Sequence, residues 1–476
     1  MRQMLRDLIA YLPTRVVPGA LGLALVAILT RLFPPHEYAD WALFQTVNAL
    51  FLTVSIAWLG SSAARFLPAA KSEKEAARLA RLLARWGAAA VLATLALLAA
   101  AFWAAGPRLP ATFRALAPVA APALVCVAIT ELILALLRGR REVGRYTALS
   151  LWSTIGAFAV GLGLVAGWGL RVEAMIWGLL AAAVTAAPWG LRRALGAPPG
   201  AGAVPAETAV EIVRYGLPAL VINVLTWALS VSDRYLLELM RGPHEMGVYA
   251  AAYSLAERPI FFINSAFLVA TTPLGFAVWE QEGLQRSREY LAQLTRTYLL
   301  VGLPAAVGLG VLAVPLTAVL VGAQFREGAD IIAPVAAGAL LVGLAQRYTL
   351  PFGFHKRTGA LMACYLAAAA LNVALNVAAI PRWGYRGAAF TTLAGYAALL
   401  AATWFASRRF YTWAFPFATF ARAAAGAAVM GAGVWALVRW APLPSWALLA
   451  GGVAGGAACY GAVLLALGEF RARART

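Results

Sequence analysis

The chain has 476 residues, of which 62% are hydrophobic and 12% are charged, and its formal net charge is +19. Soluble domains carry about 25% charged residues, and a soluble globule of this length could not hide so much apolar surface, so a soluble fold is excluded. The basic residues stand in short clusters between apolar runs, a pattern of membrane topology rather than of nucleic-acid binding.

The apolar runs are about twenty residues long, rich in Ala, Leu, Val and Gly, and lack the alternation of a membrane β-barrel. They predict an all-α integral membrane protein with about fourteen transmembrane helices, the first of them uncleaved. In chain order the predicted spans are 11–33, 41–66, 80–104, 114–138, 146–168, 172–192, 212–240, 246–276, 292–322, 329–353, 358–380, 386–407, 417–438 and 445–467. The ninth span contains Pro304 and Pro315 and is expected to be kinked or broken.

No extramembrane domain is predicted. The longest polar connection, at 194–210, is rich in Pro, Gly and Ala and indicates a flexible cytoplasmic linker. It separates an N-terminal six-helix lobe, residues 1–193, from a C-terminal six-helix lobe, residues 211–410. Residues 411–476 supply two additional transmembrane helices and a basic tail.

Lys and Arg are distributed unequally between the two sides of the predicted bundle. The side that takes the two termini and every second loop holds the basic clusters, and the other side holds scattered single arginines. By the positive-inside rule, both termini are predicted to be cytoplasmic.

Two pairs of short motifs indicate an internal repeat. PHEYADWA begins at Pro35 and PHEMGVYA begins at Pro243, 208 residues later; WGLR begins at Trp168 and WGYR begins at Trp383, 215 residues later. Each Pro-His-Glu starts a predicted helix, and each Trp-Gly pair opens one. Because order and offset agree, the first six spans map onto the next six in the same orientation, as in transporters built from parallel repeats with a site between two bundles.

His36 and His244, two of the three histidines, lie in these motifs and raise the alternative of a metal or catalytic site. Each has one adjacent glutamate and they fall in different lobes, whereas a metal site needs several converging ligands. We therefore predict no metal site, no catalytic residue and no cofactor. The motifs are interpreted as turns between helices, with the glutamate at the positive end of the new helix dipole.

Three stretches carry a resemblance to a known family. They are NVALNVAAIPRWGYRGAAFTTLAGY from Asn372 to Tyr396, SDRYLLELMRGPHEMGVYAAAYSLAE from Ser232 to Glu257, and VVPGALGLALVAILTRLFPPHEYADWALF near the start. They resemble the polysaccharide transporter family, the O-antigen and exopolysaccharide flippases, of the superfamily that also holds lipid II flippases and the multidrug and toxin extrusion transporters. With the number of spans, the resemblance covers nearly the whole chain.

The resemblance implies two six-helix lobes that work by alternating access through a cationic cavity between them. It implies as cargo an undecaprenyl-diphosphate-linked oligosaccharide, moved from the cytoplasmic to the periplasmic leaflet of the bacterial inner membrane for O-antigen, capsule or exopolysaccharide synthesis. The implied partners are this lipid-linked glycan, the lipid bilayer, a polysaccharide polymerase and glycosyltransferases, and no nucleic acid.

A diphosphate needs a hydrated, cationic path, and charged side chains in a bilayer are costly, so polar residues at membrane depth are candidates for lining it. Guanidinium suits phosphate because it stays ionised and presents a planar fork of donors. The predicted substrate-binding residues are Arg258, Arg15, Arg65, Arg347, Asn223, Asn48, Asn264, Asn372 and Asn376. For Arg15, Arg65 and Arg347, snorkelling to lipid head groups is an equal alternative.

Three embedded acids, Asp233, Glu257 and Glu131, are the candidates for coupling to an H⁺ or Na⁺ gradient. Asp233 could instead form a structural ion pair with Arg234. An acid beside an arginine tends to stay ionised and titrates poorly near neutral pH, which weighs against proton coupling.

The alternative functions are a lipid II flippase, a multidrug or small-molecule exporter of the same superfamily, and an enzyme of the same pathway. The many arginines near the cavity helices argue against a cationic drug as cargo. An enzyme is disfavoured because every predicted outer loop is short and no nucleophile–base pair is visible. The chain is therefore predicted to be a transporter and not an enzyme.

Overall fold

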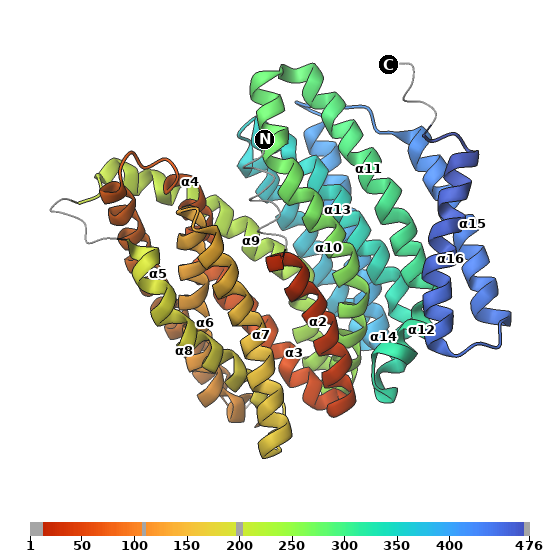
Figure 1. The fold of residues 1–476 in the computed structure, drawn as a ribbon, viewed down its shortest axis with the longest axis horizontal. Coiled ribbons are helices and arrows are strands. Elements are labelled where there is room, and N and C mark those ends of the chain that lie inside the picture. The colour runs from red at the N-terminus through yellow and green to blue at the C-terminus, as the bar shows by residue number, and fades with distance from the viewer. Residues whose placement is uncertain (1–12, 107–110, 197–202, 471–476) are drawn as a thin grey trace. The chain divides into compact units, whose positions relative to one another are not determined.

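The computed structural model describes residues 13–106, 111–196 and 203–470, without the side chains of residues 13–16, 111–113, 269, 270 and 273. These ranges contain fifteen α-helices, a π-helical segment at Thr53–Ala57, a 3₁₀ segment at Ala323–Ile331 and no strand (Figure 1). The α-helices are α2 (Pro13–Leu32), α3 (Pro35–Leu52), α4 (Trp58–Phe66), α5 (Glu73–Ala105), α6 (Ala111–Gly139), α7 (Val143–Trp168), α8 (Glu173–Leu195), α9 (Ala206–Arg241), α10 (Pro243–Gln281), α11 (Gly283–Val311), α12 (Ala313–Leu320), α13 (Ile332–Phe354), α14 (Thr358–Ser407), α15 (Phe417–Trp440) and α16 (Ser445–Ala466).

Eleven helical stretches of the described chain are long and apolar enough to cross a bilayer, which confirms the prediction of an all-α, multi-pass membrane protein. The described apolar part of α2, Val17–Leu32, is shorter. α14 has 50 residues, but its backbone leaves helical geometry at Gly384, with φ 55° and ψ −140°. A straight helix of that length would measure about 75 Å, more than twice the hydrocarbon thickness of about 30 Å. α14 is therefore two helices that meet at the WGYR turn.

The predicted ninth span is broken, as its prolines suggested, and the break lies between them. α11 ends at Val311 and α12 begins at Ala313, with Leu312 at φ −85° and ψ 7°. Pro304 lies within α11, whereas Pro315 lies in the first turn of α12. A proline in a first turn removes no intrahelical hydrogen bond, so the break precedes it.

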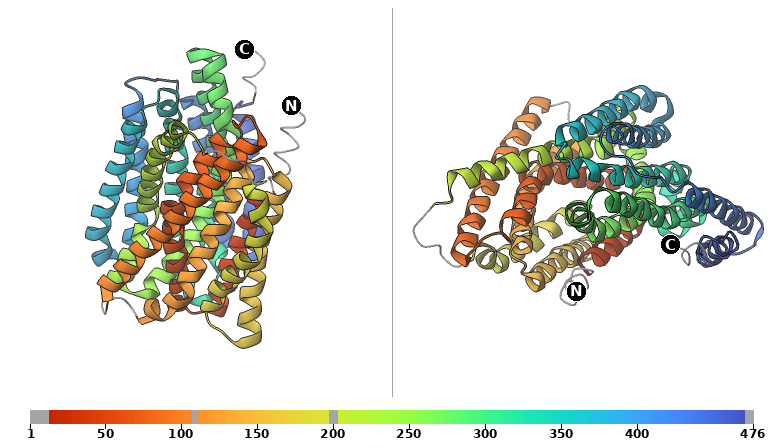
Figure 2. Two further views of the ribbon diagram at one scale, coloured as in Figure 1. Left: turned by 90° about the vertical axis from the view of Figure 1, so that its left-hand side faces the viewer. Right: turned by 90° about the horizontal axis from the view of Figure 1, so that it is seen from above.

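The chain forms two compact units. Unit 1 contains Met1–Leu25 and Glu37–Trp227, and unit 2 contains Val26–His36 and Ala228–Thr476. The border falls inside α9, so this helix contributes residues to both units. In unit 1, α8 packs against α6 and α7. In unit 2, α13 packs against α10, α11 and α14, while α15 packs against α11 and α16. Apart from α9, the long helices of each unit run roughly along one direction (Figure 2).

The predicted linker at 194–210 is only partly described. α8 continues to Leu195 and α9 begins at Ala206, so both ends of this segment are helical. Residues 197–202 lie outside the described residues.

The two repeated motifs contact each other within each unit. In unit 1, Glu37 in the first turn of α3 forms an ion pair with Arg171, which precedes α8. In unit 2, Glu245 in the first turn of α10 accepts a hydrogen bond from the backbone N–H of Tyr385, at 3.1 Å. The Pro-His-Glu glutamate therefore binds the Trp-Gly turn in both units.

Local geometry explains why both motifs need their prolines and glycines. α3 begins at Pro35 and α10 begins at Pro243, which confirms the predicted turns between helices. Gly169 has φ 64° and Gly384 has φ 55°, in the left-handed region that favours glycine. Each motif pair thus joins a proline-started helix to a glycine turn.

A buried carboxylate ties the last two helices to α11 within unit 2. Glu469, after the end of α16, is 0% exposed and accepts hydrogen bonds from Arg296 of α11 at 2.8 Å and from Thr419 of α15 at 2.7 Å. Arg422 of α15 donates to its second oxygen at 3.0 Å. Burial alone would raise the pKa of Glu469, but the hydrogen bonds from Thr419 and the two arginines outweigh it and lower this pKa below its ordinary value.

Replacement of Glu469 by Gln should destabilise the packing of α15 and α16 on α11. Loss of the charge-assisted hydrogen bonds is expected to lower the free energy of unfolding by about 2 kcal/mol. Because the pKa of Glu469 is lowered in the folded protein, its contribution is complete above the unfolded-state pKa of about 4.3 and is lost as the pH falls through the folded-state value. Thermal unfolding in detergent over a pH series measures both effects.

The matched control is Glu280→Gln, which removes an exposed carboxylate at the end of α10. It should leave unchanged both the melting temperature and the decrease of the melting temperature at low pH. If Glu469→Gln and the wild-type protein have equal melting temperatures that decrease equally at low pH, Glu469 does not stabilise the packing of α15 and α16 on α11.

Candidate functional site

Asp233 is the centre of a buried polar group in unit 2. It lies on α9 and is 1% exposed. Tyr249 of α10 donates a hydrogen bond to its Oδ2 at 2.5 Å, and Thr392 of α14 donates to the same oxygen at 3.0 Å. Oδ1 is buried and accepts no hydrogen bond from any described residue. Because a buried carboxylate oxygen without a donor is unfavourable, this oxygen is suited to receive a proton or a metal cation.

Arg234 lies between the two acids of this group. Its Cζ is 5.2 Å from the centroid of the Tyr253 ring, and its charge interacts with the carboxylates of Asp233 and Glu257. The hydroxyl of Tyr253 is 3.3 Å from that of Tyr396 on α14. Two acids therefore balance the charge of Arg234, which makes it a poor candidate for holding an anionic ligand.

Arg258 has different surroundings. It lies on α10, is half-buried, and its charge interacts with that of the adjacent Glu257. Its guanidinium takes part in no hydrogen bond within the described part of the chain. Its N–H donors are thus available to an anion such as a phosphoryl group.

Arg347 lies inside unit 2 rather than along an open path. It is 1% exposed, and its Nη1 donates to Oδ1 of Asn264 at 2.5 Å and to the backbone carbonyl of Gly343. Its Cζ is 3.8 Å from the centroid of the Tyr298 ring. The guanidinium neither snorkels nor meets solvent, so a ligand would reach it only after α10, α11 and α13 separate.

Asn372 and Asn376 join the two halves of α14. Both are 0% exposed. Asn372 donates to the backbone carbonyl of Thr391 at 3.0 Å, Asn376 donates to Oδ1 of Asn372 at 3.1 Å, and the Thr391 hydroxyl donates to Asn376. The two asparagines, predicted as substrate-binding residues, hold one half of α14 against the other.

Two predicted residues of unit 1 differ in whether their polar groups have a partner. Arg65 is exposed, with Nη2 3.7 Å from Oε1 of Glu211 and Cζ 4.6 Å from the centroid of the Tyr215 ring. Asn48 on α3 is half-buried, and its Oδ1 is buried without a hydrogen-bond donor among the described residues. Arg65 therefore has a partner for its charge, whereas the amide oxygen of Asn48 lacks one.

Two further candidates of unit 1, Asn223 and Glu131, join no cluster among the residues whose side chains the structure describes. Asn223 is half-buried on α9, and Glu131 is exposed on α6. The side chain of Arg15 lies outside the described residues.

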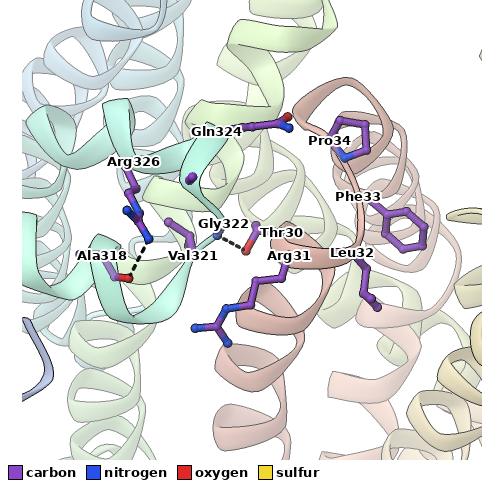
Figure 3. Close-up of a pocket in the computed structure, with 11 residues that line it drawn as sticks. Thr30, Arg31, Leu32, Phe33, Pro34, Ala318, Val321, Gly322, Gln324 and Arg326 are labelled. Atoms are coloured by element: carbon purple, nitrogen blue, oxygen red, sulfur yellow. Dashed lines mark hydrogen bonds between the residues drawn. The ribbon is translucent and has the colours of Figure 1, made fainter.

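A cavity of about 420 Å³ opens where the end of α2 meets the turn after α12 (Figure 3). The backbone N–H of Gly322 donates to Oγ1 of Thr30 at 3.2 Å, and Arg326 donates to the carbonyl of Ala318 at 3.4 Å. Arg31 donates to the carbonyl of Val319 at 2.5 Å. Both arginines bind carbonyls at the end of α12, so helix capping accounts for their charges.

The histidines of the repeated motifs lie apart from the Asp233 group. His36 is exposed, and Nε2 of His244 is 3.2 Å from Oε1 of Glu327. No group of three or more His, Cys, Asp or Glu side chains converges anywhere in the part of the chain that the structure describes.

Tyr249 and Thr392, which donate hydrogen bonds to Asp233, were not among the predicted site residues, whereas Glu257 was. Tyr249, Tyr253 and Glu257 recur every fourth position and share one face of α10, a signal that was available in the sequence. Thr392 gave no such signal, because a threonine in an apolar helix often bonds its own backbone instead.

Comparison with solved structures finds the same fold in transport proteins. The lipid II flippase MurJ in an inward closed conformation matches 98% of this chain and 100% of its own, with a TM-score of 0.78 and 14% identity. A multidrug resistance transporter of the MATE family, in the MOP superfamily, matches 81% of this chain and 93% of its own when inward-facing, with a TM-score of 0.65 and 14% identity. Its outward-facing form covers 83% and 94%, with a TM-score of 0.56 and 14% identity.

These matches show the fold, which the chain shares with a lipid II flippase and with multidrug transporters of the MATE family. A comparison with curated protein sequences gave no match. The family model described as "Polysaccharide biosynthesis protein" matches residues 28–330, more than half of the chain, in agreement with the resemblance of its motifs. The chain therefore belongs to this polysaccharide biosynthesis protein family.

Proposed function

We propose that the protein is a flippase that moves undecaprenyl-diphosphate-linked oligosaccharides from the cytoplasmic to the periplasmic leaflet of the bacterial inner membrane by alternating access. The observation that carries this proposal is that a member of a polysaccharide biosynthesis family has the fold of a lipid II flippase. A transporter within polysaccharide synthesis is suited to moving the lipid-linked intermediate. Glycosyltransferases would supply the cargo, and a polymerase would consume it to make O-antigen, capsule or exopolysaccharide.

The proposed topology has fourteen spans in two six-helix halves, followed by α15 and α16. Eleven spans have support from length and hydropathy, and α2, α10 and the division of α14 at Gly384 would supply the other three. The equivalent contacts of Glu37 and Glu245 support a parallel repeat. Cytoplasmic termini then place the basic clusters on the side that the positive-inside rule requires.

Arg258 is the proposed contact for the diphosphate. Its charge is half-buried in a membrane helix, and its donors are not used by described residues. The low dielectric around such a guanidinium strengthens its attraction to an anion. Its planar group can also donate two hydrogen bonds to phosphate oxygens. Arg234 differs, because Asp233 and Glu257 both neutralise it.

Asp233 is the proposed site of coupling to an H⁺ or Na⁺ gradient. Oδ2 already accepts from Tyr249 and Thr392, whereas Oδ1 lacks a donor among the described residues. A cation bound at Oδ1 would change the charge balance with Arg234. That change would bias the packing of α9 against α10 and α14.

A lipid II flippase is the second candidate function. The match to lipid II flippase MurJ over 98% of this chain favours it, since both cargoes would be lipids. An exporter of cationic drugs is the weaker alternative, because Arg258 would repel such a cargo.

Replacement of Arg258 by Ala should abolish surface polysaccharide while the protein still inserts. Loss of a charge-assisted phosphate contact is expected to reduce transport by about tenfold or more. The measurement is surface polysaccharide in a deletion strain complemented with each variant, alongside the amount of protein in the membrane. Arg382→Ala is the control, because Arg382 is exposed and donates to the carbonyl of Ala378 at 3.1 Å. Normal polysaccharide in Arg258→Ala would remove Arg258 from the mechanism.

Replacement of Asp233 by Asn should uncouple transport from an ion gradient, because it keeps the shape of the side chain and removes its charge. Flipping of a fluorescent lipid-linked glycan in proteoliposomes, with H⁺ and Na⁺ gradients imposed separately, measures the effect. Tyr249→Phe is the control, since it removes one hydrogen bond to Oδ2 and keeps the carboxylate. Persistent gradient dependence in Asp233→Asn would exclude Asp233, and loss of that dependence in Glu131→Gln would point to Glu131 instead.

Genetic complementation distinguishes the two proposed flippase functions. The wild-type chain should restore surface polysaccharide to a strain that lacks its own polysaccharide flippase. It should not restore growth to cells depleted of their lipid II flippase. Rescue of growth without rescue of polysaccharide would replace the proposed function by the second candidate.

A further inference from the structure

A polar cavity of about 430 Å³ lies in unit 1, where the end of α4, the start of α5 and the end of α6 meet. Its walls are the turn from Leu67 to Glu73 and the turn from Gly139 to Glu142. We propose that this cavity binds a phosphoryl group, carried by an anionic lipid head group or by free phosphate. This site uses none of the residues proposed above for transport, so it stands independently of the transport function.

Arg140 is the centre of the proposed site. Its side chain is 10% exposed and forms an ion pair through Nη2 with Glu73. Its Nε and Nη1 are buried and have no hydrogen-bond acceptor among the described residues. A guanidinium carries five N–H donors, so this cation lacks acceptors on two of its three nitrogens. A phosphoryl group has several oxygens in a geometry that fits a guanidinium fork, and would supply them.

Glycines on two sides hold Arg140 in place. A Cβ at Gly139 would lie 2.7 Å from the backbone oxygen of Ala63, so the end of α6 approaches α4 this closely only with glycine. A Cβ at Gly196 would lie 2.8 Å from Nη2 and 2.9 Å from Nη1 of Arg140, so the backbone of Gly196 covers the guanidinium. Arg81 donates to the carbonyl of Gly196 at 3.4 Å. The arginine is therefore preorganised, which lowers the entropy lost on binding.

Arg141 brings a second cation to the cavity at a strained backbone position. Its φ is 59°, in the region that favours glycine, and its side chain is exposed. The backbone N–H of Glu142 donates to the carbonyl of Leu137 at 3.0 Å, as in helix ends that glycine normally caps. Glycine would be unstrained at this position. The presence of an arginine there indicates that its charge has a function.

Positive charge is in excess around the cavity. Lys71 is the third cation of its wall, and the acids of the wall are Glu73 and Glu142. Glu73 pairs with Arg140, and Glu142 pairs with Arg145 at 2.5 Å. The start of α5 also lies in the wall, and its dipole favours an anion there.

Thermal unfolding of the purified full-length protein tests the proposal. Inorganic phosphate is titrated against chloride at constant ionic strength, and reconstitution into phosphatidylcholine nanodiscs with and without phosphatidylglycerol forms the second arm. Stabilisation by phosphate identifies free phosphate as a ligand, and stabilisation by phosphatidylglycerol identifies a lipid head group. The absence of both effects in the wild-type protein would overturn the proposal.

Variants assign the effect to the cavity. Arg140→Gln is expected to weaken phosphate or phosphatidylglycerol binding by about tenfold or more, as for loss of a charge-assisted contact. Arg193→Gln, an exposed arginine at the end of α8 that does not line the cavity, should bind as the wild-type protein does. Equal losses in both variants would mean unspecific attraction to a basic surface and would overturn the site.

Arg141→Gly separates binding from stability if Arg140→Gln does not fold. Glycine relieves the left-handed backbone, so the melting temperature without ligand should stay equal or rise. Its shift on adding phosphate or phosphatidylglycerol should nevertheless shrink, because one cation is lost. An undiminished shift in Arg141→Gly would remove Arg141 from the site.

Discussion

In each unit, the glutamate of a Pro-His-Glu motif binds a Trp-Gly turn that lies far away in the sequence. In unit 2 this contact sets where the second half of α14 begins, because Glu245 accepts from the N–H of Tyr385, directly after Gly384. The amides at a helix start have no partner within the helix, and a carboxylate there satisfies one and complements the dipole. Thr392 and Tyr396 follow on the same helix half, so the contact also positions the residues that meet the Asp233 group.

Burial of charge sets the second constraint. Asp233 lies where α9, α10 and α14 meet, and one donor comes from each of the two neighbouring helices. Arg347 is buried without an acid, and the ring of Tyr298 and the oxygen of Asn264 replace one. A desolvated cation over an aromatic ring is stabilised by about 2 kcal/mol. Nε and Nη2 of Arg347 are buried and have no acceptor among the described residues. A neutral environment of this kind restrains the arginine without cancelling its charge.

The sequence was sufficient for the fold class and for the turns, because these depend on local composition. Long apolar runs, and Pro35 and Pro243 at helix starts, correspond to observed features. The sequence was not sufficient to predict where the side chain of Arg347 lies. α13 is apolar on nearly all sides, so its pattern does not fix which face meets α10 and α11. The partners of Asp233 depend in the same way on helices distant in sequence.

The two acid–arginine dipeptides, Asp233-Arg234 and Glu257-Arg258, illustrate this limit. Adjacent residues of a helix point about 100° apart and do not face each other, so the dipeptide does not make an ion pair by itself. Contacts from another helix distinguish the two arginines. Arg234 meets the ring of Tyr253 and the charge of Glu257 across the α9–α10 contact. Glu257 is thereby shared between two arginines, which leaves Arg258 with only part of a counter-charge. The position of one tyrosine and one glutamate on α10 thus decides which of two similar arginines stays available to an anion.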